Sequence, residues 1–354
     1  MSARFRTALD AIAGYKAGRR PVGLEEVVRL ASNEVPFGPL PGVVEAAAAA
    51  MSESHRYPDP AATMLRTALA EKYGVASDNI GVGTGSVGLL QSIAQIVVDQ
   101  GDEVLYAWRS FEAYPVIARV VGGEPVQVPL TATAEHDLDA MAAAITERTR
   151  LVLLCSPNNP TGPALRQADV ERFLDALPDH VLVVLDEAYA EFVSNPNSVD
   201  GTTLLAGRPN LVVLRTFSKA YGLAGLRVGY CLADPLIVAA LAKTGVPFGV
   251  NAAAQAAAVA SLAAADAVRE RAELVRTERN RLRGGLIALG LDVPETEGNF
   301  VWLPLGDRSF EYGEAMAERG ILVRPYDDDG VRITVGTDKD VDRVLEATEE
   351  LLKG

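Results

Sequence analysis

Short runs of β-branched and apolar residues alternate with longer amphipathic stretches between residues 81 and 231. The runs with the length and composition of strands lie at 101–107, 124–130, 151–155, 181–189, 211–217 and 227–233. Helical periodicity occurs between most of them, at 87–98, 111–121, 138–145 and 168–177. Because strands that alternate with helices usually pair in parallel, this pattern predicts a mostly parallel sheet wrapped by helices.

The pattern changes after residue 250. Residues 251–289 are predicted to form one long helical stretch, because they are rich in Ala, Arg and Glu and contain no proline. The shorter elements predicted after it are strands at 299–305 and 330–336 and helices at 310–319 and 339–352. Thr337 and Asp338 supply an N-cap for the last helix.

The domain organisation follows from this change and from the length of 354 residues, which suits about two domains. We expect a large domain at 36–250 and a smaller α+β domain at 251–354, which begins with the long helical stretch. Residues 1–35 carry little periodicity. We expect them to form an arm that packs with the smaller domain.

Composition excludes several classes of function. The chain has 33 Lys and Arg against 47 Asp and Glu, a formal net charge of −14, and no basic cluster, which argues against a nucleic-acid partner. No segment has the ~20 continuous apolar residues of a membrane span, and the first residues lack the apolar core of a secretory signal. Two cysteines cannot make a disulfide scaffold. We expect a soluble, cytoplasmic protein.

Unusual residues stand at the predicted strand ends, where ligands of open α/β sheets bind. Asp186 ends the apolar run VLVVL, and Tyr189 follows three residues later. A carboxylate in that place is costly to bury unless it is paired. It is therefore either a solvent-exposed strand end or helix cap, or an acceptor for a cationic ligand group.

Lys219 follows the run LVVLRTF and is one of six lysines in the chain. Small, hydroxyl and aromatic residues surround it in the sequence, so it is either a surface lysine in a glycine-rich loop or a desolvated amine that can act as a nucleophile. Thr216, Ser218 and Arg227 supply two hydroxyls and a guanidinium nearby, a set that suits one phosphate.

Two glycine- and asparagine-containing segments add weaker signals. VGTGSVGLL at 82–90 places free N–H groups near Gly85 and Ser86, where an anion can bind. CSPNNPTG at 155–162 presents Asn158 and Asn159, and by itself is best interpreted as a turn. Together with the lysine and the carboxylate, these are the parts needed to hold pyridoxal phosphate (PLP).

The chain resembles the fold-type I PLP-dependent aminotransferases of class I/II, and within them the histidinol-phosphate aminotransferase group. The resemblance covers essentially the whole chain and rests on segments that occur in the same order in this family. These are LASNEVPFGP (30–39), RYPDP (56–60), GTGS (83–86), SPNNPTG (156–162), DEAY (186–189), TFSKAYGLAGLRVGY (216–230) and RPY…VRITVG (324–336). AWRSFEAYP (107–115), VPF (246–248) and NFVWLPLG (299–306) are most similar to the actinobacterial branch called aromatic amino acid, or phenylalanine, aminotransferases.

The resemblance implies an aspartate aminotransferase-like fold, with a sheet of seven-stranded type in the large PLP-binding domain. It also implies that Lys219 carries PLP as a Schiff base and that Asp186 pairs with the pyridinium nitrogen. The phenyl ring of Phe111 would stack on the pyridine. The other implied contacts are those of Asn159 and Tyr189 with O3′, and those of Gly85, Ser86, Thr216, Ser218 and Arg227 with the phosphate.

The resemblance further implies a homodimer with shared sites, because Tyr57 matches a residue that reaches the phosphate of the neighbouring subunit. Arg332 would bind the substrate carboxylate, with Arg324 as its helper. Tyr15 and Asn33 are implied pocket residues. No metal site is expected, and the three histidines lie outside every motif.

The expected reaction is a ping-pong transamination in which Lys219 acts as general base. Phenylalanine or tyrosine with 2-oxoglutarate is the first choice of substrates, and histidinol phosphate is the alternative donor, because a guanidinium pair suits either anion. Relatives of this fold also include amino acid decarboxylases and transcription regulators. The chain lacks a basic DNA-reading helix, which argues against a regulator.

Overall fold

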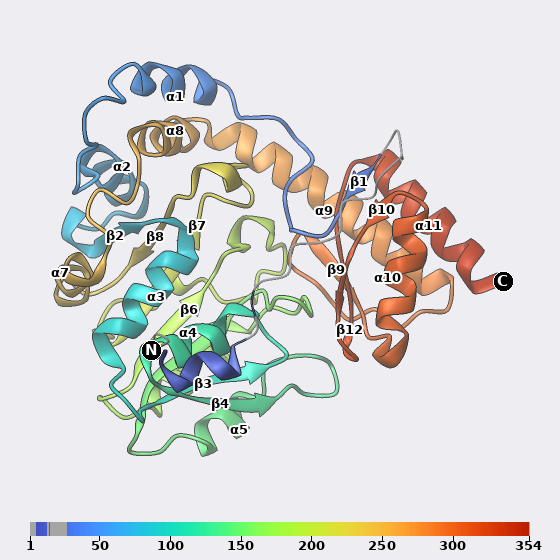
Figure 1. The fold of residues 1–354 in the computed structure, drawn as a ribbon, viewed down its shortest axis with the longest axis horizontal. Helices are drawn as coiled ribbons and strands as arrows, with labels where there is room; N and C mark the ends of the chain where they lie inside the picture. The colour runs from blue at the N-terminus through green and yellow to red at the C-terminus, as the bar shows by residue number, and fades with distance from the viewer. Residues whose placement is uncertain (1–4, 13, 15–26, 354) are drawn as a thin grey trace, which may run out of the picture.

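A computed structural model describes residues 5–12, 14 and 27–353 (Figure 1). Its larger part is built on a seven-stranded sheet of order β2-β8-β7-β6-β5-β3-β4. All strands are parallel except β8, which runs antiparallel to both of its neighbours. The predicted mostly parallel sheet is therefore confirmed. The strands are β2 (Ile80–Gly83), β3 (Glu103–Trp108), β4 (Glu124–Pro129), β5 (Thr149–Cys155), β6 (Leu182–Asp186), β7 (Leu211–Thr216) and β8 (Gly229–Leu232).

Both faces of this sheet are covered, which explains why its central strands are apolar throughout. Leu151 and Leu153 of β5 pack in one cluster with side chains of α3 and α4, whereas Val152 and Leu154 pack with α6 on the other face. The helices of the larger part are α1 (Val43–Met51), α2 (Thr63–Tyr73), α3 (Gly85–Val97), α4 (Ala113–Val121), α5 (Leu138–Ala143), α6 (Gln167–Asp175), α7 (Pro235–Thr244) and α8 (Ala252–Ala263).

The smaller part contains a three-stranded antiparallel sheet of order β11-β12-β9 (Figure 1). Thr337 caps the last helix, since its Oγ1 accepts a hydrogen bond of 3.2 Å from the backbone N–H of Asp340. The elements are β9 (Phe300–Leu303), α10 (Ser309–Glu318), β10 (Ile321–Leu322), β11 (Arg324–Tyr326), β12 (Gly330–Thr334) and α11 (Asp338–Lys353).

The prediction of one helical stretch over 251–289 is wrong, because two helices occupy it. α8 ends at Ala263 and α9 (Ala265–Ala288) begins after Ala264, whose φ of −91° and ψ of 34° are not helical. No glycine or proline marks the break. The alanine-rich α8 packs against α1 of the larger part, while α9 contacts α11 and β9 of the smaller part, so tertiary packing sets the bend.

Two described segments of the expected N-terminal arm contact different parts of the molecule. β1 (Val28–Arg29) pairs in parallel with β10 of the smaller part. The short 3₁₀ turn Thr7–Ala11 instead lies against α4 of the larger part. Arg6 explains this position, because its Nη1 donates a 2.7 Å hydrogen bond to the carbonyl of Val120, in the last turn of α4, where carbonyls lack helical partners.

A membrane-spanning helix is absent from the described part of the chain, since none of its helices combines sufficient length with sufficient apolarity.

Candidate active site at the carboxyl edge of the large sheet

The carboxyl ends of adjacent strands bring the first site residues together. Asp186 is the last residue of β6 and Thr216 the last of β7, and these strands are parallel neighbours. Lys219 follows three residues after Thr216. β2 runs parallel to β7 with β8 between them, so the turn after β2 that contains Gly85 opens at the same edge. Topology alone therefore places three segments of the predicted site in one region.

The side chain of Lys219 is half-buried in this region. Its Nζ donates a 3.1 Å hydrogen bond to the carbonyl of Ser32 and lies 5.8 Å from the ring centroid of Tyr189. Burial, followed by the positive charge of Arg332, lowers the pKa of Lys219 to about 7. An amine with such a pKa is substantially neutral near physiological pH and can act as a nucleophile or a base.

Asp186 is also buried, with 5% of its surface exposed. Its Oδ2 accepts a 3.0 Å hydrogen bond from the hydroxyl of Tyr114, whereas Oδ1 has no hydrogen-bond partner among the described residues. Burial raises the pKa of Asp186 to about 6. A buried carboxylate oxygen without a partner is costly, and this one suits a cationic N–H group of a ligand.

Tyr114 is a site residue that the sequence interpretation missed. It lies in α4, is fully buried, and packs edge-on against Phe111 with ring centroids 5.6 Å apart and an interplanar angle of 87°. An aromatic residue on the buried face of an amphipathic helix looks like ordinary core. Only the sheet topology reveals that its hydroxyl meets the carboxylate at the end of β6.

The segment around Gly85 forms a cradle for an anion. A Cβ on Gly85, which has a φ of +76°, would lie 2.6 Å from Nη2 of Arg227, and a Cβ on Gly229 would lie 2.5 Å from the backbone N of Ser86. The Arg227 guanidinium donates to Oγ of Ser218 over 3.2 Å, and the backbone N–H of Ser218 donates to Oγ1 of Thr216 over 3.0 Å. A guanidinium, two hydroxyls and the N-terminus of α3 thus converge where only glycine fits.

Arg332 approaches the site from β12 of the smaller part and is buried. Its Nη1 donates to Oδ1 of Asn159 and its Nη2 to the carbonyl of Ala31, both over 2.6 Å. Its Nε has no hydrogen-bond partner in the part of the chain that the structure describes. Both acceptors are neutral oxygens. The guanidinium can therefore exchange them for a carboxylate, which binds more strongly in a bidentate arrangement.

Asn33 and Tyr189 form a pair beside Lys219. Nδ2 of Asn33 donates a 2.9 Å hydrogen bond to the hydroxyl of Tyr189, and Oδ1 of Asn33 accepts one of 3.1 Å from Thr334. Burial raises the pKa of Tyr189, so its phenol stays protonated. Asn33 thus orients the phenol.

The remaining predicted residues lie elsewhere or outside the described chain. Tyr57 is 81% exposed and stacks on Phe248, with ring centroids 4.5 Å apart. Arg324 is paired with Glu112 at the edge of the site. Tyr15 lies outside the described residues.

A buried network supports the loop that carries Asn159. Oδ1 of Asn158 accepts a 2.7 Å hydrogen bond from Ser110 and lies 3.1 Å from Nε2 of His136. Burial lowers the pKa of His136 to about 4, so the ring is neutral. Asn158 therefore anchors the loop rather than facing a ligand, a role that the turn composition alone did not indicate.

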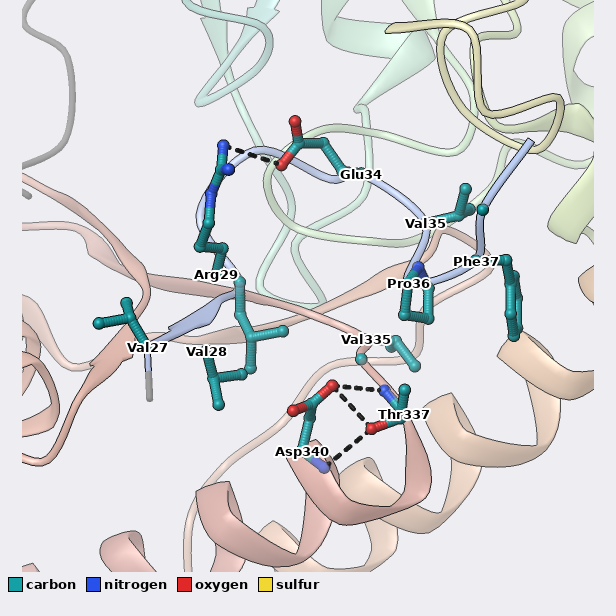
Figure 2. A pocket seen from close by; sticks show the side chains of 13 residues that line it. Val27, Val28, Arg29, Glu34, Val35, Pro36, Phe37, Val335, Thr337 and Asp340 are labelled. Atoms are coloured by element: carbon teal, nitrogen blue, oxygen red, sulfur yellow. Dashed lines mark hydrogen bonds and ion pairs between the residues drawn. The ribbon is translucent and has the colours of Figure 1, made fainter. Parts of the chain in front are cut away.

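A separate cavity of about 430 Å³ lies between residues 27–38 and 335–340 (Figure 2). Arg29 and Glu34 face each other across 3.8 Å on one side, and Asp340 accepts hydrogen bonds from Thr337 on the other. Among the predicted site residues that the structure describes, none lines this cavity. In the described ranges, no group of three or more His, Cys, Asp or Glu side chains is placed to hold a metal ion.

Comparisons with known proteins agree with this geometry. The family model described as aminotransferase class I and II matches residues 25–347. The aromatic amino acid aminotransferase of Rhodococcus opacus is 56% identical over 345 residues, 98% of this chain and 95% of the relative. The protein of the same name from Nocardia farcinica is 56% identical over 339 residues, 95% of this chain and 94% of the relative.

A solved structure is similar over the whole chain. The histidinol-phosphate aminotransferase from Sinorhizobium meliloti, in complex with pyridoxal-5'-phosphate, superposes with a TM-score of 0.90 at 32% identity. The match covers 100% of this chain and 98% of that structure. The predicted fold is therefore confirmed.

Proposed function

The chain belongs to the class I and II aminotransferases, and we propose that it transfers the amino group of phenylalanine or tyrosine to a 2-oxo acid such as 2-oxoglutarate with the help of PLP. The name shared by the relatives at 56% identity supports the aromatic substrate. The bound PLP in the Sinorhizobium meliloti structure supports the cofactor.

The residues of the site fit PLP. The unpartnered Oδ1 of Asp186 suits a protonated pyridine nitrogen, and the cradle at Gly85 and Arg227 suits the phosphate. Phe111 would stack on the pyridine, and Asn159 and Tyr189 would bind O3′. When bound, the cofactor supplies a ring that accepts the electrons of a substrate Cα bond.

The chain's own residues supply binding and proton transfer. Arg332 would bind the α-carboxylate of the donor through its fork of N–H groups and fix the Cα near Lys219. The neutral Nζ of Lys219 would then take the proton from that Cα as general base. Asp186, kept as a carboxylate by a cationic partner, would hold the ring nitrogen protonated.

The observation that carries the proposal is that three groups lie at one site: the half-buried Lys219 amine with its lowered pKa, the buried Asp186 carboxylate and the Arg332 guanidinium held by neutral oxygens. A donor panel tests it. With 2-oxoglutarate as acceptor, we expect kcat/KM for phenylalanine or tyrosine to exceed that for histidinol phosphate by about 10²-fold, the size of difference that binding contacts achieve. A preference for histidinol phosphate, or carbon dioxide release without an oxo acid, would contradict the proposal.

Histidinol phosphate is the second candidate donor, and two observations favour it. The 32% identical Sinorhizobium meliloti structure carries that name. Arg324 and Arg332 are also direct partners in the β11–β12 pair, an arrangement that suits a phosphate. The same donor panel separates the two candidates.

A cytoplasmic location is part of the proposal, because Cys155 and Cys231 are free thiols, as expected in a reducing compartment.

A homodimer is also part of the proposal. Tyr57 and Phe248 form an exposed aromatic pair, which suits a subunit interface. If Tyr57 reaches the phosphate in the neighbouring subunit, Tyr57→Phe should keep the dimer and raise the Kd for PLP about 10-fold, since a hydrogen bond to a charged group is lost. Sedimentation and PLP titration measure both. A monomeric wild-type chain, or an unchanged Kd, would contradict this prediction.

A further inference from the structure

Three arginines surround the ring of Tyr326 at the edge of the site. The guanidinium carbons of Arg109, Arg324 and Arg332 lie 5.6, 5.7 and 5.6 Å from its centroid. Arg324 and Arg332 face each other directly across β11 and β12, so their side chains leave the same face of the sheet. This face therefore carries enough positive charge to bind more than one negative charge.

Carboxylates neutralise two of these arginines. Nε of Arg109 donates to Oδ2 of Asp329 over 2.6 Å. Nη2 of Arg324 donates to both carboxylate oxygens of Glu112, over 3.1 and 3.2 Å. Arg332 has only neutral acceptors within the described chain. Among the three arginines, Arg332 is thus the one whose charge no carboxylate of the described chain balances, and it faces the substrate side of the site.

The carboxylate of Glu112 comes from the larger part of the molecule. Glu112 directly follows Phe111 and precedes the first residue of α4. Its side chain is 43% exposed and that of Arg324 is 22% exposed, so the pair is partly in contact with solvent. Ion pairs of this kind contribute little to the stability of the fold. The position of Glu112 next to Phe111, the predicted pyridine-stacking residue, instead suits a role in substrate choice.

We propose that Glu112 determines substrate specificity by holding Arg324 away from the substrate anion. A carboxylate carries one negative charge, which Arg332 alone can balance, whereas a phosphate monoester carries close to two near pH 7. With Arg324 engaged, a phosphorylated donor lacks its second cation and also meets the charge of Glu112. This inference rests on the proposed function. It names Glu112 as the residue that makes the enzyme prefer amino acid donors to a phosphorylated amine.

The test uses the PLP-loaded enzyme in single-turnover half-reactions, which keep the oxo acid out of the measurement. Glu112→Gln should raise the ratio of kcat/KM for histidinol phosphate to that for phenylalanine by about 10-fold, because it removes the carboxylate charge that pairs with Arg324. Glu311→Gln is the matched control, since it removes the same charge from an exposed position in the first turn of α10. That control should leave the ratio unchanged.

Equilibrium binding gives a second readout. Inhibition by phenyl phosphate should strengthen about 10-fold in Glu112→Gln relative to inhibition by 3-phenylpropionate, which carries a single carboxylate. In Glu112→Gln/Arg324→Gln both ratios should return to the wild-type level, because the gain requires the guanidinium of Arg324. A gain that persists in the double variant, or that also occurs in Glu311→Gln, would overturn the proposal.

Failure of this inference is distinguishable from failure of the proposed function. A wild-type enzyme that prefers histidinol phosphate would contradict the proposed function. A wild-type enzyme that prefers phenylalanine, together with ratios that Glu112→Gln does not change, would contradict the inference alone.

Discussion

Lys219→Ala is expected to lower the rate of the donor half-reaction by at least about 10²–10⁴-fold, the usual contribution of a positioned general base. The side chain is half-buried and its pKa is lowered to about 7, so its amine is the basic group that the site offers to the substrate Cα. Stopped-flow absorbance of the PLP-loaded enzyme, mixed with phenylalanine, measures this rate.

Lys219→Arg is the matched control for that experiment. It keeps a long cationic side chain but cannot lose its proton near neutral pH. We expect it to be as slow as Lys219→Ala, with a different affinity for PLP. Partial recovery of the alanine variant by added small amines would agree with a missing base, whereas full turnover in either variant would exclude Lys219 as the base.

Asp186→Asn is expected to lower the activity strongly and to raise the stability of the cofactor-free protein. The amide cannot keep a ring nitrogen protonated as a carboxylate does, so we expect the half-reaction rate to fall by about 10²-fold or more. The cofactor-free protein should become more stable above pH 6, because the variant removes a buried charge whose Oδ1 lacks a hydrogen-bond partner within the described ranges. A gain on the order of 1–3 kcal/mol follows from the raised pKa.

The pH dependence of that gain is specific. The pKa of Asp186 is raised from 3.8 to about 6 in the folded protein, so the folded state holds this proton more tightly than the unfolded chain does. The stability of the wild type relative to Asp186→Asn therefore declines as the pH rises from about 4 to about 6, and stays constant above that range. Denaturant unfolding of both cofactor-free proteins at several pH values measures it. An equal difference at pH 4 and pH 7 would contradict the prediction.

The elements of the large sheet could be predicted because their signal is local. A run such as VLVVL has the length, branching and lack of charge of a strand covered on both faces, whatever lies around it. The break at Ala264 could not be predicted, since alanine favours helix on both sides of it. Only the different partners of α8 and α9 produce the bend.

The candidate site likewise contains residues that could be predicted from the sequence and partners that could not. Asp186 and Lys219 stand at strand ends, where the sequence itself points to a ligand. The partners that tune them come from distant segments: the hydroxyl of Tyr114 from α4 and the carbonyl of Ser32 from the N-terminal region. A backbone carbonyl has no sequence signature, and a tyrosine on an apolar helix face resembles core, so neither partner could be predicted.

The segment from β1 to Asn33 has a mechanical consequence. It is hydrogen-bonded to the smaller part through β10 and Thr334, and it also supplies the carbonyl that accepts from Lys219. Any displacement of the smaller part relative to the large sheet is therefore transmitted to the environment of that amine. The proton affinity of Lys219 thus depends on how the two parts sit together. A conformational change at the three-stranded sheet would change the electrostatic environment at the edge of the seven-stranded sheet.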